Sequence, residues 1–301
     1  MKKQVDAKVC AVLAVVVLYK KTFNAFPSAL RVQHWLGEFN STSTALKLAH
    51  CLIYDNSPVP HSREIDDSHK RISVFHDEFN GGTRAAYLYA LQLAFEKGCS
   101  WILLLDHDTD VPIDFFEAVD AALATACNIE KIGAVVPYVF DRGYQISPSR
   151  ITKYGRGYAK NGAWKTPRRN TTLTAIASAT LVRADALESI LPIPLELKLD
   201  HLDHWIFREL QKRGCCIVVS AARVEHSLSV QSMKTLDVNR YRSILDAELV
   251  YLKSDAAYSV VKHLMWHVIR CFKILLVVRR MSLFFACVGG LLKILKTDDN
   301  H

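Results

Sequence analysis

The sequence predicts an α/β fold with a doubly wound, mixed and mainly parallel sheet flanked by helices, followed by a basic helical extension. Apolar runs typical of buried strands alternate with helical patterns over roughly the first 110 residues, which is the order found in βαβ units. After residue 254, basic and apolar residues recur at helical spacing and acidic residues become rare. We therefore expect a globular domain over 1–253, with halves at 1–110 and 111–253, and a tail over 254–301.

Length, charge and cysteine content limit the class of protein. The 301 residues, half of them apolar, suffice for one large α/β domain or two small ones. The net charge of +8 fits polyphosphate or anionic membrane partners, and because much of the excess lies near the C-terminus we expect no nucleic-acid partner. The eight cysteines include no C-x-x-C pair, which is typical of reduced thiols in a cytosolic protein.

The elements of the first half follow one another along the chain. Residues 9–19 form a valine-rich run that closes on Lys20 and Lys21 without a small-residue cleavage pattern, so we expect a first strand and not a secretion signal. Asn80-Gly81-Gly82 precedes a helical pattern that ends at Gly98. Further strands are expected at 46–54, 72–75 and 101–105, and the helix covers 85–95.

The second half is less regular. The segment 141–170 is rich in Gly, Pro, Arg and Tyr, which predicts a loop or small hairpin over the site. In the tail, residues 260–296 contain no Asp or Glu, and the uncharged stretch 281–292 is shorter than the roughly 20 residues of a membrane-spanning helix. Strands are expected at 132–139, within 173–182 and at 215–219, and a helix is expected at 200–213.

Two carboxylates follow the apolar run 101–105. Asp106 and Asp108 stand at the carboxyl end of that strand, where open α/β sheets bind their ligands. Once the chain turns out of the sheet, both carboxylates can converge on one hard divalent cation that also binds phosphate oxygens. His107 should point away from both. An acidic loop at a strand end has the same residues, so the flanking segments must decide between the two interpretations.

Four segments line up at carboxyl ends of predicted strands, and in their order they resemble glycosyltransferase family 2, the inverting nucleotide-sugar enzymes with a GT-A fold. The resemblance is to the bacterial rhamnosyltransferase-like branch, whose pattern of N-x-G-G, a helix with small residues and W-x-x-x-L-D-x-D-T is matched by FNGGTRAAYLYALQLAFEKGCSWILLLDHDT. Ser178-Ala179 replaces a usual Ser-Gly pair, and a usual Arg-Asn pair after His226 is missing. The four segments are Asp55, Asn80-Gly81-Gly82, Asp106 with Asp108, and 200–203.

The resemblance implies a nucleotide diphosphate sugar as donor and Mg²⁺ or Mn²⁺ as cofactor. Asp108 would ligate the metal, and Asp106 would hold the donor ribose or sugar and a metal-bound water. Asp55 would accept a hydrogen bond from the imide of uracil or thymine, although an Asx turn in Asp55-Asn56-Ser57-Pro58 explains this residue equally well. Further donor contacts are expected from the backbone of Gly81 and Gly82 and from Arg84 in the first helical turn.

Inverting transfer also requires a general base for the acceptor hydroxyl, which the resemblance places in the acidic segment 200–205. We select Asp203, whereas Asp200 is better explained as the N-cap of a capping-box-like helix start. His226 matches a position where many relatives place a histidine near the metal, so it joins Asp106 and Asp108 as a candidate ligand. Arg240 and Arg242 are expected in a basic loop over the pyrophosphate.

The leading hypothesis is a metal-dependent inverting glycosyltransferase acting on a lipid-linked or surface polysaccharide. The first choice of donor is dTDP-L-rhamnose, with UDP-galactose, UDP-glucose or UDP-galactofuranose as alternatives. The basic tail is expected to bind the anionic inner face of the bacterial cytoplasmic membrane peripherally, unless its apolar face is buried on the main domain or on a second subunit. Two alternatives are a catalytically silent scaffold and a phosphohydrolase with a metal cluster of Asp106, Asp108, His201, His204 and His226.

Overall fold

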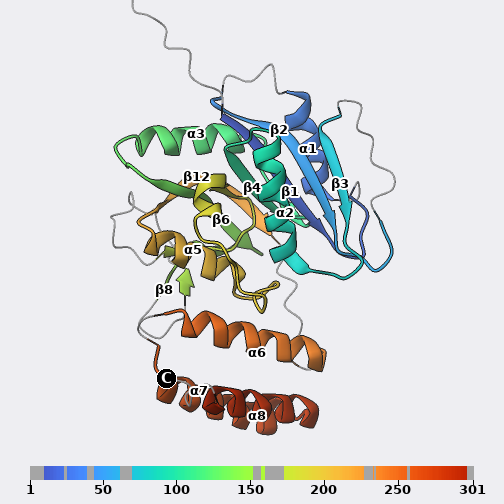
Figure 1. The fold of residues 1–301 in the computed structure, drawn as a ribbon, viewed down its shortest axis with the longest axis vertical. Coiled ribbons are helices and arrows are strands. Elements are labelled where there is room, and N and C mark those ends of the chain that lie inside the picture. Colours follow the sequence, from blue (N-terminus) through green and yellow to red (C-terminus); the bar gives the residue numbers. More distant parts are fainter. Residues whose placement is uncertain are drawn as a thin grey trace, which may run out of the picture. The chain divides into compact units, whose positions relative to one another are not determined.

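The computed structural model of the protein shows a mixed α/β architecture that divides into two compact units (Figure 1). The first unit comprises Met1–Pro192 and Asp203–Ser227, and the second Ile193–Leu202 and Leu228–His301. The predicted strand over 9–19 is confirmed from residue 10 onward, since residues 1–9 lie outside the described part. The structure describes residues 10–23, 26–38, 44–61, 70–151, 157–159, 173–226, 233, 235–255 and 258–296.

The central sheet of the first unit has the strand order β3-β2-β1-β4-β11-β6-β12-β5, with β7 paired to β6. The long strands β3, β2, β1 and β4 run parallel to one another, as do β6 and β12, whereas the short strands β11, β5 and β7 pair antiparallel. The mixed doubly wound sheet is therefore confirmed. The strands are β1 Cys10–Leu18, β2 Leu46–Asp55, β3 Ile72–His76, β4 Trp101–Asp106, β5 Thr109–Asp110, β6 Ile132–Asp141, β7 Tyr144–Ser147, β11 Thr180–Arg183 and β12 Cys216–His226.

Helices cover both faces of this sheet. On β1, Val12, Ala14 and Val16 belong to a core that includes side chains of α1 (Pro27–Gly37) and α3 (Phe115–Thr125). The intervening residues of β1 are also buried, and α2 (Gly82–Glu96) packs on β1 and β4. Burial on both faces explains why β1 is apolar throughout. Two short helices, α4 Ala184–Glu188 and α5 Leu202–Lys212, complete this part of the chain.

The segment 141–170 is partly described. β6 turns back into β7 as an antiparallel pair, and a separate small sheet has the order β10-β8-β9. The hairpin prediction is thus confirmed for the described residues, while 152–156 and 160–170 lie outside them. The small sheet consists of β8 Ser149–Ile151, β9 Gly157–Ala159 and β10 Leu173–Thr174.

The second unit is mainly helical from residue 238 to residue 296, in the part of it that the structure describes. It comprises α6 (Val238–Lys253), α7 (Val260–Lys273), a π-helical turn (Ile274–Val278) and α8 (Met281–Lys296), with an apolar core between them. Arg240 and Arg242 lie in α6, so the predicted basic loop at that place is wrong; Asp237 caps the helix by accepting hydrogen bonds from the Asn239 and Arg240 amides. Among the described residues, no helix is both long and apolar enough to cross a membrane.

Candidate active site

The carboxyl ends of three parallel strands meet at one edge of the sheet. In β2, Asp55 pairs with Leu18 of β1, and on the other side of β1 Val17 pairs with Asp106 of β4. Because neighbouring strands lie about 4.8 Å apart, this register puts Asp55 and Asp106 roughly 10 Å apart across the end of β1. The predicted position of Asp55 and Asp106 at the carboxyl ends of their strands is therefore confirmed.

Asp108 and His226 are brought together by a strand pairing that the sequence did not predict. β5 pairs antiparallel with the end of β12, which places His226 opposite Thr109. His226 Nδ1 lies 3.4 Å from Asp108 Oδ1 and 3.3 Å from Thr109 Oγ1. The Asp108 side chain is 28% exposed and that of His226 is 11% exposed, so the pair is accessible from solvent.

Asp106 is held by a serine from the neighbouring strand connection. Ser178 Oγ donates to Asp106 Oδ2 over 2.8 Å, and Ser178 is buried. The next residue, Ala179, has φ +57°, in the left-handed region that favours glycine. The chain therefore has a glycine-like backbone conformation at the position where the resemblance expects glycine after the serine.

Asp203 lies in the first turn of α5 and is anchored beside Asp106. The amide of Ala177 donates to Asp203 Oδ2 over 3.0 Å, so Ala177 and Ser178, which are consecutive, hold the two carboxylates. Both carboxylates affect the pKa of Tyr87 in α2. Burial raises the pKa of this phenol well above its usual value, and the negative charges of Asp203 and Asp106 raise it further. The electrostatic coupling places Tyr87 near both carboxylates.

His107 points away from the two carboxylates, as predicted. Its ring packs edge-on against Phe26, with ring centroids 4.5 Å apart, and its carbonyl accepts a hydrogen bond from Ser28 Oγ over 2.8 Å. These contacts fasten the Asp-His-Asp segment to the start of α1. His107 is thus a packing residue in the structure.

Asp55 forms the Asx turn that was one of its two interpretations. It is fully buried, and its Oδ1 and Oδ2 accept hydrogen bonds from the amides of Ser57 (3.0 Å) and His61 (2.7 Å). The pyrimidine contact stays a prediction. The following residue, Asn56, accepts from the Gly82 amide over 3.3 Å and so links the end of β2 to the start of α2.

The glycine loop before α2 is tightly folded. Asn80 and Gly82 have φ values of +50° and +76°, and a Cβ on Gly81 would lie 2.7 Å from Asp77 Oδ2. The same Asp77 oxygen accepts from the Gly81 amide (2.8 Å) and from the Tyr54 hydroxyl (2.9 Å). Burial and this contact both raise the pKa of Tyr54, which keeps it a hydrogen-bond donor.

The sequence did not indicate Asp77, Ser178 or Tyr87 as site residues. For Asp77, its place three residues before the Asn-Gly-Gly turn was an available signal, because Asp side chains cap nearby backbone amides. Tyr87 and Ser178 meet their partners only through tertiary packing. Arg84, a predicted donor contact, lies half-buried in the first turn of α2.

The remaining predicted residues belong to the second unit. Both terminal nitrogens of the Arg240 guanidinium donate to the Asp200 carboxylate, with Nη2 2.8 Å from Oδ1. Asp200 is therefore an ion-pair partner of α6. Arg242 is exposed, and its Nη1 lies 3.4 Å from Asn239 Oδ1.

A preformed multi-ligand metal centre is absent from the described residues, where no three His, Cys, Asp or Glu side chains are grouped to hold an ion. The phosphohydrolase cluster is therefore not formed in that part of the chain, and His204 instead bonds Thr174 Oγ1 through Nδ1 over 2.6 Å. Asp106, Asp108 and His226 likewise do not make a closed three-ligand set. The Asp108 carboxylate, which lies beside His226, suits an ion that takes its other ligands from water and phosphate, as Mg²⁺ commonly does.

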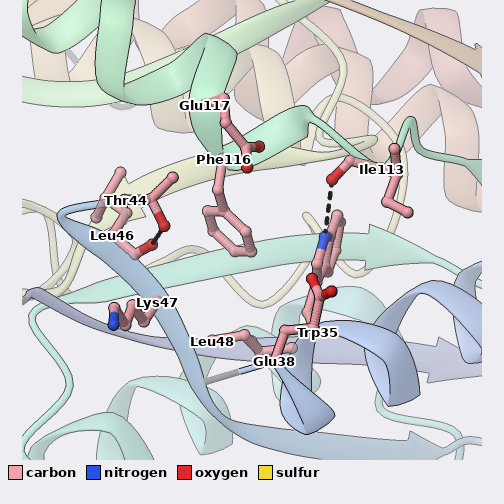
Figure 2. A pocket seen from close by; sticks show the side chains of 9 residues that line it. All are labelled: Trp35, Glu38, Thr44, Leu46, Lys47, Leu48, Ile113, Phe116 and Glu117. Atoms are coloured by element: carbon pink, nitrogen blue, oxygen red, sulfur yellow. Dashed lines mark hydrogen bonds between the residues drawn. The ribbon is translucent and has the colours of Figure 1, made fainter. Parts of the chain in front are cut away.

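A small cavity lies at the opposite, amino end of β2 (Figure 2). Its volume of about 20 Å³ is enough for a water molecule and far below the several hundred Å³ of ligand pockets. This cavity is therefore not the donor site. It is lined by Trp35, Glu38, Thr44, Leu46, Lys47, Leu48, Ile113, Phe116 and Glu117.

No family model and no curated protein matches this sequence, whereas solved structures do. GalNAc-T7 with UDP, GalNAc and Mn²⁺ superposes with a TM-score of 0.54 at 12% identity, over 81% of this chain and 48% of that one. S. aureus TarS 1–349 with UDP-GlcNAc superposes with a TM-score of 0.53 at 13% identity, over 94% and 81%. The fold is that of the GT-A glycosyltransferases. This chain spans about half the length of the GalNAc-T7 structure, and at these identities the likeness shows the fold alone.

Proposed function

We propose that this protein is an inverting glycosyltransferase that takes its sugar from a nucleotide diphosphate donor bound at the carboxyl edge of β2, β1 and β4. One observation supports the proposal above all: Asp106 and Asp203 are held by consecutive residues, and Asp108 is paired with His226, on the ligand-binding edge of a GT-A fold. A purely structural acidic loop has no need for four such groups drawn from separate parts of the chain.

The donor nucleotide is a pyrimidine nucleotide. Structures with this fold hold UDP with Mn²⁺, or UDP-GlcNAc, which supports a uridine or thymidine diphosphate. The resemblance to the rhamnosyltransferase-like branch makes dTDP-L-rhamnose our first choice, with a UDP-hexose as the alternative. The acceptor is a lipid-linked or surface glycan at the inner face of a bacterial membrane.

We assign the metal, Mg²⁺ or Mn²⁺, to Asp108 and His226, with Asp106 near enough to contact the donor ribose or sugar. The ion would neutralise the charge that builds on the leaving pyrophosphate. A carboxylate ligand suits both ions, whereas the His226 imidazole is an unusual ligand for Mg²⁺. Ser178 fixes the orientation of Asp106. Gly81, Gly82 and Arg84 at the start of α2 complete the donor contacts, because a helix N-terminus favours phosphate.

Asp203 is the general base. The acceptor oxygen forms a bond to the anomeric carbon while the bond from that carbon to the pyrophosphate oxygen breaks, and the acceptor proton moves to the Asp203 carboxylate. The Ala177 amide holds Oδ2 of this carboxylate in place.

Calorimetric titration tests the donor site. Wild-type protein is titrated with UDP, dTDP and their sugars, with and without Mg²⁺ or Mn²⁺, beside Asp108→Asn and the matched variant Asp110→Asn. Asp110 is an exposed aspartate two residues further along the chain, so both variants lose the same charge. We expect metal-dependent binding that Asp108→Asn loses and Asp110→Asn keeps.

Three results would contradict the proposal. If no nucleotide binds with either metal, the chain is a catalytically silent scaffold. If the protein instead hydrolyses a simple phosphoester without any acceptor, it is a phosphohydrolase. If Asp108→Asn and Asp110→Asn bind the nucleotides equally well, Asp108 does not belong to the donor site.

A further inference from the structure

Helix α7 presents apolar side chains to solvent and polar ones to the interior. His263 and His267 are 7% and 2% exposed, whereas Val261 and Phe272 are 76% and 59% exposed. A helix on the surface of a soluble protein normally has the reverse arrangement. Side chains three or four residues apart share one helix face, so the exposed residues make a continuous stripe. We call this the apolar stripe: Val261, Met265, Val268 and Phe272 of α7, continued by Leu276 of the π-helical turn.

Partners on the other helices hold the polar face of α7 inward. His267 Nε2 donates to the Cys287 carbonyl over 2.9 Å, and a Cβ on Gly290 would lie 2.9 Å from that nitrogen. Arg270 donates twice to Glu248 of α6, over 2.5 and 2.7 Å. Turning α7 to bury the apolar stripe would break these contacts and leave buried polar groups unpaired. The outward orientation of the stripe is therefore the stable one for this unit.

Basic residues and a tryptophan border the stripe along one side. Lys262, Trp266 and Lys273 are spaced by four and seven residues and so share one line along the helix, and all three are exposed. Between residues 260 and 296 the chain has no acidic residue. An apolar face flanked by Lys and an interfacial Trp is characteristic of helices that lie in the surface of an anionic bilayer.

The geometry points to an anionic lipid bilayer as the partner of α7, with the apolar stripe inserted below the headgroups and Lys262 and Lys273 at the level of the phosphates. A second copy of the chain fits less well. A two-fold contact through this stripe would bring two basic borders together with no acidic residue of this segment to neutralise them. The inference deepens the proposed function, which puts the acceptor at the inner face of a membrane. It concerns lipid binding alone, so its test is independent of donor binding.

Vesicle binding by the full chain tests the inference. Protein is sedimented with vesicles of phosphatidylcholine, or of phosphatidylcholine mixed with phosphatidylglycerol, while tryptophan emission is recorded. We expect binding to the anionic vesicles and a blue shift of emission that Trp266→Phe removes. Phe272→Gln should weaken the partitioning about tenfold. Lys262→Gln and Lys273→Gln should each weaken it about fivefold on anionic vesicles only.

Leu30→Gln is the matched control, because Leu30 is an apolar residue of α1 that is 67% exposed in the first unit. It should bind vesicles like the wild type, and circular dichroism should show that all four glutamine variants are folded. Equal vesicle binding by Phe272→Gln and Leu30→Gln would overturn the inference. The inference would also be overturned if the protein were a monomer that binds no vesicles. It would likewise be overturned if light scattering showed a dimer that Phe272→Gln dissociates and that does not bind vesicles.

Discussion

Replacing Gly81 by alanine tests whether the loop at the proposed donor site is as tightly folded as the structure shows. A Cβ at this position would lie 2.6 Å from Ala85 Cβ and 2.7 Å from Asp77 Oδ2. Gly81 itself has φ −65°, which alanine adopts freely, so the cost of the substitution is steric. Forcing a methyl group into a packed turn costs about 1–3 kcal/mol. Displacing Asp77 from the Gly81 amide loses a hydrogen bond worth about 1 kcal/mol. We expect Gly81→Ala to destabilise the protein by about 2–4 kcal/mol in total.

Urea unfolding followed by circular dichroism measures this loss against a matched variant. Gly37, at the end of α1, has no atom within 4 Å of its would-be Cβ. Gly37→Ala should therefore leave the free energy of unfolding unchanged or raise it by up to about 1 kcal/mol, because alanine favours helix. If both variants unfold at the same urea concentration with the same slope, the reasoning about the loop is wrong.

Three further predictions concern single contacts. Burial lowers the pKa of His263 from 6.5 to about 4, so its contribution to stability is present above pH 6.5 and is lost as the pH falls toward 4. Hydrogen exchange in α7 should show about 2 kcal/mol less protection at pH 5 than at pH 7. If His263→Gln loses as much protection between pH 7 and pH 5 as the wild type does, the prediction is wrong. Burial would raise the pKa of Glu248, but its hydrogen bonds and charge contact with Arg270 lower it. In a double-mutant cycle with Glu248→Gln and Arg270→Met we expect a coupling energy of about 1–2 kcal/mol, and strict additivity would refute the pair. Ala179→Gly should cost at least about 1 kcal/mol less than Ala14→Gly in urea unfolding, because only Ala179 has a positive φ; equal losses would count against backbone strain there.

Most strands of the fold could be predicted from the sequence because each is a local apolar run. The runs ending at Asp55 and Asp106 are buried over most of their length, so their residues are mainly apolar. The helices α1 and α3 were not predicted from the sequence. In α1 the apolar positions are mixed with polar ones, which hides the helical pattern. Pro27 at the start of α1 was an available signal, because proline favours the first turn of a helix.

The candidate site was predicted only where its residues are neighbours in the chain. Asp106 and Asp108 are two residues apart at a strand end, which pattern and resemblance can reveal. The contacts of Ser178 with Asp106 and of Ala177 with Asp203 depend on strand order. Sequence spacing contains no information on those distances.

The C-terminal helices show the same division between sequence and tertiary structure. The sequence by itself determined that residues 260–296 are helical, basic and amphipathic, because helical periodicity and charge are local properties. Only the tertiary structure decided which face of α7 is buried. The hydrogen bond of His267 to the Cys287 carbonyl and the ion pair of Arg270 with Glu248 turn the polar face inward. Buried polar groups must find partners, and those partners lie on other helices, so the exposure of the apolar stripe follows from packing and not from the pattern of α7 alone.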